Sequence, residues 1–242
     1  MTGMQTVGII PARSGSKSVP HKNLARFHGK PLIAWTILTA LQSARLDRVI
    51  VSTDSPAIAR VARRFGAETP FLRPKSLATA RIGIEPVLTH AYEWLKEQEG
   101  YQADALALLL PTNPLRRPSH IDEAIDLFVA RRADSVVAVN ETPANHTPYW
   151  TLVKHKRRRV TLFSGEPLTD ILTRRQDFPQ TCYARNDLVY VVRPHNLFEQ
   201  PANLYGQRIE LYITGSEYDA DINTAADWEA AELRFARASK ND

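Results

Sequence analysis

The stretch IIPARSGSKSVPHKNL, from Ile9 to Leu24, directly follows the first apolar run of the chain. It combines three serines and one glycine with one arginine, two lysines, one histidine and one asparagine. Gly15 permits a positive φ angle and lets the backbone approach a ligand closely. Cations and hydroxyl donors gathered in one short loop favour an anionic ligand, and a polyphosphate needs both in a small volume.

The part of this segment that follows the first expected strand, residues 11–24, is called the cationic loop below. It does not match the P-loop pattern G-x-x-x-x-G-K-[ST], because Ser16 separates Gly15 from Lys17, and it does not match G-x-G-x-x-G. A solvated surface loop with scattered charges is the alternative interpretation. The groups available to an anion are the hydroxyls and cations of Ser14, Ser16, Ser18, Arg13, Lys17 and Lys22.

Apolar runs typical of buried strands alternate along the chain with segments of helical periodicity. We expect strands near residues 6–10, 48–54, 105–110, 135–140, 187–192 and 209–214, and helices over 31–44, 55–67, 85–100, 119–132 and the end of 219–238. The alternation predicts an α/β fold, a three-layer sandwich with a mainly parallel, Rossmann-like sheet. Such sheets bind ligands beyond the carboxyl ends of their strands, so the polar segments that follow the first three strands should converge on one crevice.

Local signals place the starts of two helices. Ser55 is expected to cap one helix, with Pro56 at its first position. Ser119 is expected to cap another. His90 is expected to be a structural residue inside a helix, and His120 to lie at the surface.

The alternation breaks between residues 141 and 181. The sequence YWTLVKHKRRRVTLF, residues 149–163, predicts two short strands around a basic turn. We expect a small inserted subdomain over residues 141–181 within a single domain of residues 1–242. The basic run is interpreted as a solvated turn rather than a nucleic-acid site, because no aromatic platform or known module accompanies it.

Composition limits the possible partners and location. The net charge of +5 favours anionic partners. Cys182 is the only cysteine, which excludes an intrachain disulfide and favours a reducing, cytoplasmic setting. The N-terminus lacks signal-peptide features, and the longest apolar run, residues 105–110, is too short to span a bilayer, so we expect no membrane partner.

Motifs in order along nearly the whole chain resemble those of the cytidylyltransferases that activate acidic sugars, the CMP-sialic acid synthetases and their relatives for legionaminic, pseudaminic and Kdo acids. They are IIPARSGSKSVPHKNL, GKPLIAWTI, DRVIVSTDS, GAETPFLRP, EPVLTHA, LLPTNPLR, RNDLVYVV and DADINTAADWEAAE. Members of this family transfer CMP from CTP to the anomeric hydroxyl of an α-keto sugar acid and release pyrophosphate. The resemblance therefore implies CTP and an acidic sugar as substrates, and a homodimer.

The resemblance also implies which residues hold the nucleotide. Arg13, Ser16 and Lys17 match positions that bind the triphosphate, and Lys22 and Asn23 close the loop near the ribose and phosphates. An arginine near the cytosine is matched by Arg73. The implied catalytic residues are Arg13, Lys17, Lys22 and Asp221, and the implied cofactor-binding residues are Ser14, Gly15, Ser16, Asn23, Arg73 and Thr112.

A Mg²⁺ ion is implied at the segment DADINT, residues 219–224. The resemblance places Asp221 at the first acidic position of the family motif and Asn223 at the second, while Asp219 lies two residues earlier. Residues i and i+2 of an extended segment point the same way, so Asp219 and Asp221 can face one ion. Mg²⁺ takes oxygen ligands, usually one or two carboxylates with phosphate and water.

At the acceptor end, the resemblance places Thr112 and Arg116 beside the sugar, and Asn186 at the asparagine of a family NG motif that reads ND here. Tyr190 matches an aromatic of the following strand and is expected to pack. The inserted subdomain is implied to reach across to the partner's active site. The residues implied to contact a sugar carboxylate there are Arg174, Arg175, Gln180 and Arg185.

The chain departs from the family at Leu110, where a glutamine is usual, and at Ala80 and Ile84, where an aspartate and a hydroxyl residue are usual. These changes leave open another acid, such as Kdo or a phosphonate, or another nucleotide. Asn223 leaves open a non-catalytic nucleotide-binding protein. A further strand-end residue, Asp54, is interpreted either as a helix-start residue or as a group of the crevice.

Overall fold

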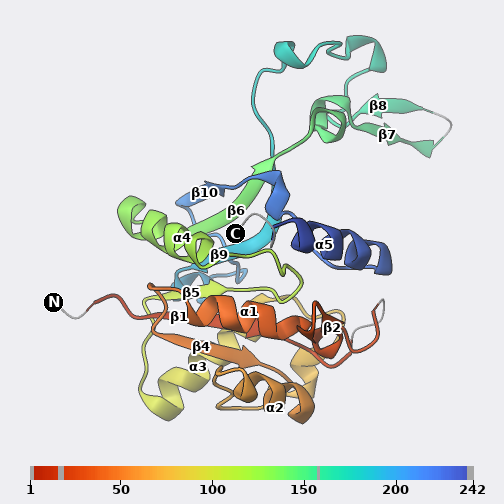
Figure 1. Ribbon diagram of the computed structural model, residues 1–242. Coiled ribbons are helices and arrows are strands. Elements are labelled where there is room, and N and C mark those ends of the chain that lie inside the picture. The colour runs from red at the N-terminus through yellow and green to blue at the C-terminus, as the bar shows by residue number, and fades with distance from the viewer. Residues whose placement is uncertain (1–2, 16–18, 157–158, 239–242) are drawn as a thin grey trace.

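A six-stranded sheet forms the centre of the computed structural model, which describes residues 3–15, 19–156 and 159–238 (Figure 1). The strands lie in the order β10-β6-β9-β5-β1-β4. Only β9 runs antiparallel to its neighbours, so the mainly parallel α/β sheet predicted from the sequence is confirmed. The strands are β1 (Thr6–Pro11), β4 (Arg48–Ser52), β5 (Ala105–Leu108), β6 (Ser135–Glu141), β9 (Tyr183–Val192) and β10 (Ile209–Ile213).

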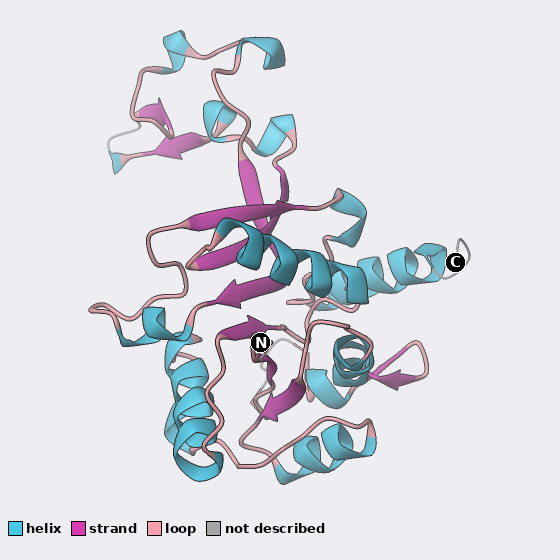
Figure 2. Ribbon diagram, turned by 90° about the vertical axis from the view of Figure 1, so that its left-hand side faces the viewer, coloured by secondary structure: helices cyan, strands magenta, loops and turns pink. Residues whose placement is uncertain are grey.

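Helices cover both faces of the sheet, which gives the three predicted layers (Figures 1 and 2). One face packs against α1 (Leu32–Leu41), α2 (Pro56–Arg64) and α4 (Pro118–Arg131). The other face packs against α3 (Glu85–Glu99). A third apolar cluster joins α5 (Ala225–Ala238) to α1 and to the small hairpin of β2 (Arg26–Phe27) and β3 (Lys30–Pro31).

The helix starts confirm one expectation and correct two. Ser55 caps α2, since its Oγ accepts a hydrogen bond from the Ile58 amide at 3.3 Å. The expectation that Ser119 caps α4 is wrong, because Pro118 already takes the first helical position and Arg117 is the N-cap. His120 is 6% exposed and its Nδ1 accepts from the Arg117 amide at 3.2 Å, so the expected surface position is also wrong.

An arm, residues 142–182, projects from the body between β6 and β9 (Figure 1). It contains the antiparallel pair β7 (Leu152–Lys154) and β8 (Val160–Leu162), so the two short strands predicted around a basic turn are confirmed. Single turns of 3₁₀ helix make up much of the remainder: η3 (Ala144–His146), η4 (Pro148–Trp150), η6 (Leu168–Asp170) and η7 (Arg175–Asp177). The arm therefore has little regular structure of its own.

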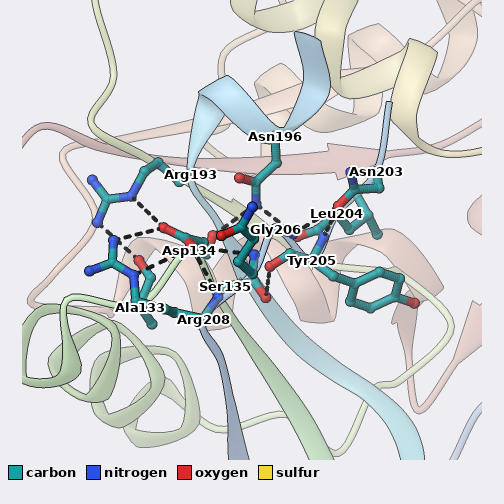
Figure 3. Close-up of polar contacts among 11 residues, drawn as sticks. Ala133, Asp134, Ser135, Arg193, Asn196, Asn203, Leu204, Tyr205, Gly206 and Arg208 are labelled. Atoms are coloured by element: carbon teal, nitrogen blue, oxygen red, sulfur yellow. Dashed lines mark hydrogen bonds and ion pairs between the residues drawn. The ribbon is translucent and has the colours of Figure 1, made fainter. Parts of the chain in front are cut away.

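The buried carboxylate of Asp134 connects the start of β6 to the segment before β10 through hydrogen bonds (Figure 3). Asp134 is 6% exposed, and its Oδ2 accepts from the Arg208 amide at 2.9 Å and the Gln207 amide at 3.3 Å. Its Oδ1 accepts from Arg208 Nη2 at 2.9 Å, and Asn196 Nδ2 donates to the Asp134 carbonyl at 2.9 Å. The hydrogen bonds from Arg208 hold the pKa of Asp134 well below its ordinary value, against the opposing effect of burial.

We expect Asp134→Asn to lower the free energy of unfolding by about 2 kcal/mol. The backbone amides of Gln207 and Arg208 and the Arg208 guanidinium would then face a side-chain amide, whose single oxygen cannot accept from all of them. Since the folded-state pKa is depressed, the stabilisation is full above the ordinary pKa of 3.8 and is lost as pH falls through the folded value. The measurement is urea unfolding at pH 7 and at pH 3.5, where the difference between the two proteins should shrink. Asp126→Asn, which breaks an exposed ion pair with Arg45, is the control and should change stability little.

Candidate active site

The segments after β1, β4 and β5 converge at the carboxyl ends of these strands, as the sequence predicts. The Ala12 amide donates to the Ser52 carbonyl at 3.0 Å, and the Arg73 amide donates to the Thr53 carbonyl at 2.8 Å. At the end of the β5 segment, the Thr112 carbonyl accepts from the Ile222 amide at 3.0 Å. Backbone contacts thus place the cationic loop and the Arg73 segment beside the end of β4, and the acidic turn, residues 219–224, beside the segment after β5.

Asp54 anchors the start of the cationic loop. Its carboxylate accepts from the Ser14 amide at 2.9 Å and from the Ser14 hydroxyl at 2.6 Å. Burial alone would raise the pKa of Asp54, but the hydrogen bonds from Ser14 and the charge of Arg73 outweigh it and hold that pKa below its ordinary value. Asn23, which is buried, donates to the Arg13 carbonyl at 3.1 Å and fixes the other end of the loop. Ser16 and Lys17, predicted to hold phosphate, lie outside the described residues.

Lys22 joins the cationic loop to the acidic turn. Its Nζ donates to the Ile222 carbonyl at 2.7 Å. Burial lowers the pKa of Lys22, the negative charge of Asp221 raises it, and the charge of Arg13 lowers it again, with a net shift downward. The cationic loop and the acidic turn therefore meet through Lys22, and Arg13 lies near enough to act on both Lys22 and Arg73.

Residues of the acidic turn line a small pocket of about 220 Å³, whose walls include Asp219, Asp221, Asp227 and Arg234. Asn223 Nδ2 donates to Asp221 Oδ2 at 2.5 Å, which orients that carboxylate. Asp227 accepts from the amides of Asn223 and Thr224 at 2.9 and 2.7 Å, so it serves as a helix-capping residue of α5.

This donor set fits a hard divalent cation bound partly by substrate. Asp219 and Asp221 both line this pocket, although Asp219 Oδ2 also accepts from Asn140 Nδ2 at 3.4 Å. Within residues 3–15, 19–156 and 159–238, no group of three His, Cys, Asp or Glu side chains is placed to hold a metal ion. Mg²⁺ usually takes one or two carboxylates and fills its remaining positions with phosphate and water. The residues are thus suited to an ion that arrives with a phosphate.

A second pocket of the cleft, about 270 Å³, is lined mostly by apolar residues, together with two arginines and Thr79. Leu77, Ile84 and Leu110 contribute to its walls, with Arg13 and Arg73. Arg73 is 5% exposed, and burial lowers the pKa of its guanidinium, although the charge of Asp54 opposes this. Its Nε finds no hydrogen-bond partner in the described part of the chain. A buried unpaired donor is costly, so this nitrogen is suited to an acceptor atom of a ligand.

Two residues assigned to the sugar by resemblance are tied to the protein interior. Arg116 is 4% exposed and donates to the carbonyls of Leu110, Asp187 and Leu188 and to the Thr36 hydroxyl. Burial lowers the pKa of its guanidinium to about 9. These contacts brace the segment between β5 and α4 against β9, and contact of Arg116 with a sugar stays a prediction.

Asn186 is also inside the protein, at 1% exposed. Its side chain donates to the Thr214 hydroxyl at 2.6 Å and accepts from the Leu188 amide at 3.3 Å. The next residue, Asp187, has a φ of 56°, which explains why a related sequence would use glycine there. Tyr190 is 4% exposed and belongs to an apolar cluster, consistent with the expected packing role.

Sequence reasoning missed Asn113, which organises the floor of the cleft. It is fully buried, and its Nδ2 donates to the carbonyls of Asn186 and Tyr218 at 3.2 and 3.0 Å. Its Oδ1 accepts from the Leu115 amide at 3.2 Å. The Asn-Pro pair at residues 113–114 is a turn signal that marks this position.

The remaining predicted acceptor residues lie away from the cationic loop, on or near the arm. Gln180 is exposed and lines a pocket of about 210 Å³ formed by residues of the arm. Arg185 donates to the Tyr205 hydroxyl at 2.8 Å. Arg174 and Arg175 pair with Asp177 and Glu141. The structure thus brings together Arg13, Lys22, Asn23, Arg73, Thr112, Asp219, Asp221 and Asn223, but not Gln180 or Arg185.

Cations facing carboxylates at the carboxyl edge of a mainly parallel sheet define a nucleotide-binding α/β protein. The chain belongs to the cytidylyltransferase family, whose model matches residues 7–238. It is 33% identical over 230 residues to the CMP-N,N'-diacetyllegionaminic acid synthase of Legionella pneumophila, with 95% of each chain covered. It is also 31% identical to the N-acylneuraminate cytidylyltransferase of Escherichia coli, over 93% of this chain and 51% of that one.

Solved structures show the same fold. A CMP:2-keto-3-deoxy-manno-octonic acid synthetase in complex with CTP superposes with a TM-score of 0.70 at 21% identity, covering 97% of this chain and 99% of that one. A 4-diphosphocytidyl-2C-methyl-D-erythritol synthase from Anaerococcus prevotii gives 0.67 at 12% identity, with 97% of each chain covered. Among the described residues, no helix has the length and apolar character needed to cross a membrane.

Proposed function

We propose that this protein transfers CMP from CTP to the anomeric hydroxyl of an acidic keto sugar of the nonulosonic class and releases pyrophosphate. The relatives named above act as CMP-sugar synthetases for acids of this class, and the family match covers nearly the whole chain. The observation that carries the proposal is the 2.7 Å hydrogen bond from Lys22 Nζ to the Ile222 carbonyl, because it unites the cationic loop and the acidic turn in one cleft.

Positioning and charge neutralisation supply most of the catalysis in phosphoryl transfer. Arg13 and Lys22 neutralise the charge that develops on the leaving pyrophosphate, and Asp54 and Asn23 hold the loop that carries them. The apolar pocket with the unpaired Arg73 Nε takes the nucleobase, with that nitrogen donating to a ring acceptor. Asp219, Asp221 and the side-chain carbonyl oxygen of Asn223 would hold a Mg²⁺ ion, which would neutralise phosphate charge and lower the pKa of the attacking hydroxyl.

A homodimer is part of the proposal, with the arm of one copy against the other. A two-stranded hairpin alone is marginal in water, and among the described elements β7 and β8 make their main contacts with each other and with the arm turns η4 and η6. Leu152 and Phe163 of the arm are 52% and 64% exposed. On β10, the alternate residues Ile209, Leu211 and Ile213 form an exposed apolar row beside the base of the arm. A second copy would cover such surfaces.

A cytoplasmic location suits the use of CTP and the single cysteine.

Lys22→Ala should lower kcat/KM roughly a hundredfold, because one positioned donor at developing charge is worth about 3 kcal/mol. The measurement is pyrophosphate release with CTP, UTP, ATP and GTP against legionaminic, pseudaminic, sialic and Kdo acids. Lys96→Ala, an exposed lysine of α3, is the control.

Unchanged turnover in Lys22→Ala would refute the role given to the cationic loop. Release with none of these pairs, together with retained CTP binding, would favour the alternative of a non-catalytic nucleotide-binding protein.

Asp221→Asn should raise the Mg²⁺ concentration for half-maximal activity about tenfold, since one of two carboxylates is lost from the ion. Binding of Mn²⁺ in the presence of CTP, followed by electron paramagnetic resonance, gives a readout independent of turnover. Glu229→Gln, an exposed carboxylate of α5, serves as the matched control. Identical Mn²⁺ titrations for Asp221→Asn and the unaltered protein would remove Asp221 from the ligand set.

Phe163→Ser should weaken the dimer at least tenfold, because burying a phenyl ring contributes about 2 kcal/mol. Sedimentation equilibrium measures the dissociation constant. Leu72→Ser changes an apolar residue that is 53% exposed outside the arm and should leave the dimer intact. A monomeric unaltered protein, or equal effects of the two substitutions, would contradict the arm-mediated dimer.

A further inference from the structure

A cavity of about 640 Å³, larger than either pocket of the cleft, lies among α1, the segment before α4, the turn η9 (Ser216–Tyr218) and α5. α1 and α4 pack on one face of the sheet, whereas Ile84 and Leu110, which wall the apolar pocket of the cleft, pack against the cluster on the other face. The cavity is therefore on the opposite side of the sheet from the pocket proposed for the nucleobase.

The wall of this cavity carries excess positive charge. Arg117, Arg234 and Arg237 line it together with a single acidic residue, Glu217. Arg116 also lines it, but its guanidinium is committed to interior carbonyls. Across the described ranges, the exposed Arg237 makes no hydrogen bond or ion pair, so its planar fork is available to an anion from solvent.

Aromatic rings make up much of the remaining wall. Trp35 and Phe235 meet edge to face with ring centroids 4.6 Å apart, and the Arg117 guanidinium lies 5.3 Å from the centre of the Tyr218 ring. Pockets that hold drug-sized ligands measure roughly 300–1,000 Å³ and combine apolar walls with a few polar anchors. A ligand that carries both an aromatic ring and a phosphate group fits this combination of aromatic wall and arginines better than inorganic phosphate does.

We propose that this cavity is a second ligand site that binds a nucleotide, with the phosphate at Arg237 and Arg234 and the ring against the aromatic wall. Arg234 also lines the acidic pocket, and its Nη1 donates to the Asp219 carbonyl. The turn η9 at the cavity directly precedes Asp219. A nucleotide that engages Arg234 competes with its bond to Asp219, so occupancy is coupled to the acidic turn. This coupling rests on the proposed function, but binding at the cavity does not.

Equilibrium dialysis with labelled CMP tests the proposal on the full chain. The unaltered protein should bind two CMP per chain. Arg237→Ala should weaken one of them at least tenfold and leave the other unchanged, while Arg73→Ala, at the pocket proposed for the nucleobase, should affect only the other. Arg64→Ala, an exposed arginine at the end of α2, is the matched control and should retain both sites. CMP should also quench the fluorescence of Trp35, and Trp35→Phe should lack that component.

The outcomes separate this proposal from the proposed function. If Arg237→Ala binds CMP with unaltered stoichiometry and affinity, or if the protein has one CMP site and Arg73→Ala abolishes it, the second site does not exist. If no sugar and nucleotide pair releases pyrophosphate, the proposed function fails, yet Arg237-dependent CMP binding would still support the cavity. Arg237→Lys keeps the charge but not the planar fork and should weaken CMP less than Arg237→Ala, which separates a direct contact from a change in folding.

Discussion

The hydrogen bond between Lys22 and the Ile222 carbonyl joins segments 200 residues apart, and the organisation of the cleft depends on it. A half-buried ammonium is costly unless it has partners. Here the carbonyl supplies a hydrogen bond and Asp221 supplies opposite charge, while Arg13 adds repulsion. A phosphate chain would relieve that repulsion, because it brings negative charge to Arg13 and Lys22 together. The cleft is thus electrostatically incomplete without an anion, as expected for a triphosphate site.

The backbone around the cleft imposes a second constraint. Loops at the carboxyl edge carry carbonyl and amide groups that must find partners once buried. Arg116 and Asn113 meet this need, since together they bind the carbonyls of Leu110, Asn186, Asp187, Leu188 and Tyr218. A side chain that satisfies so many carbonyls fixes the loops before any substrate arrives. Rigid loops keep the cationic and acidic groups at the separation that in-line transfer requires.

Sequence patterns predicted the sheet and most helices because period-2 and period-3.6 burial is a local property. They also predicted that the segments after the first three strands converge, since the carboxyl ends of parallel strands lie at one edge of a sheet. They failed where a tertiary partner decides the outcome. His120 is polar and was expected outside, but its ring accepts the Arg117 amide and packs on Tyr218 at 4.4 Å. Arg116 is held inside by carbonyls more than 70 residues away in sequence, and Asn186 by the Thr214 hydroxyl. No local sequence pattern reveals such partners.

The proposed reaction needs a nucleotide site and an acceptor-sugar site, and a single chain forms the first more completely than the second. Arg13, Lys22 and Arg73 are all placed by the body, so a nucleotide can be held by one copy. Gln180, by contrast, belongs to the arm, which projects from the body (Figure 1) and exposes Phe163 and Leu152. An arm that cannot bury its own apolar side chains needs a second surface, and docking on a neighbouring copy would order it. In the proposed dimer, the same contact that stabilises the arm would bring its polar residues to an acceptor sugar, so assembly and recognition of the acid would depend on one interface.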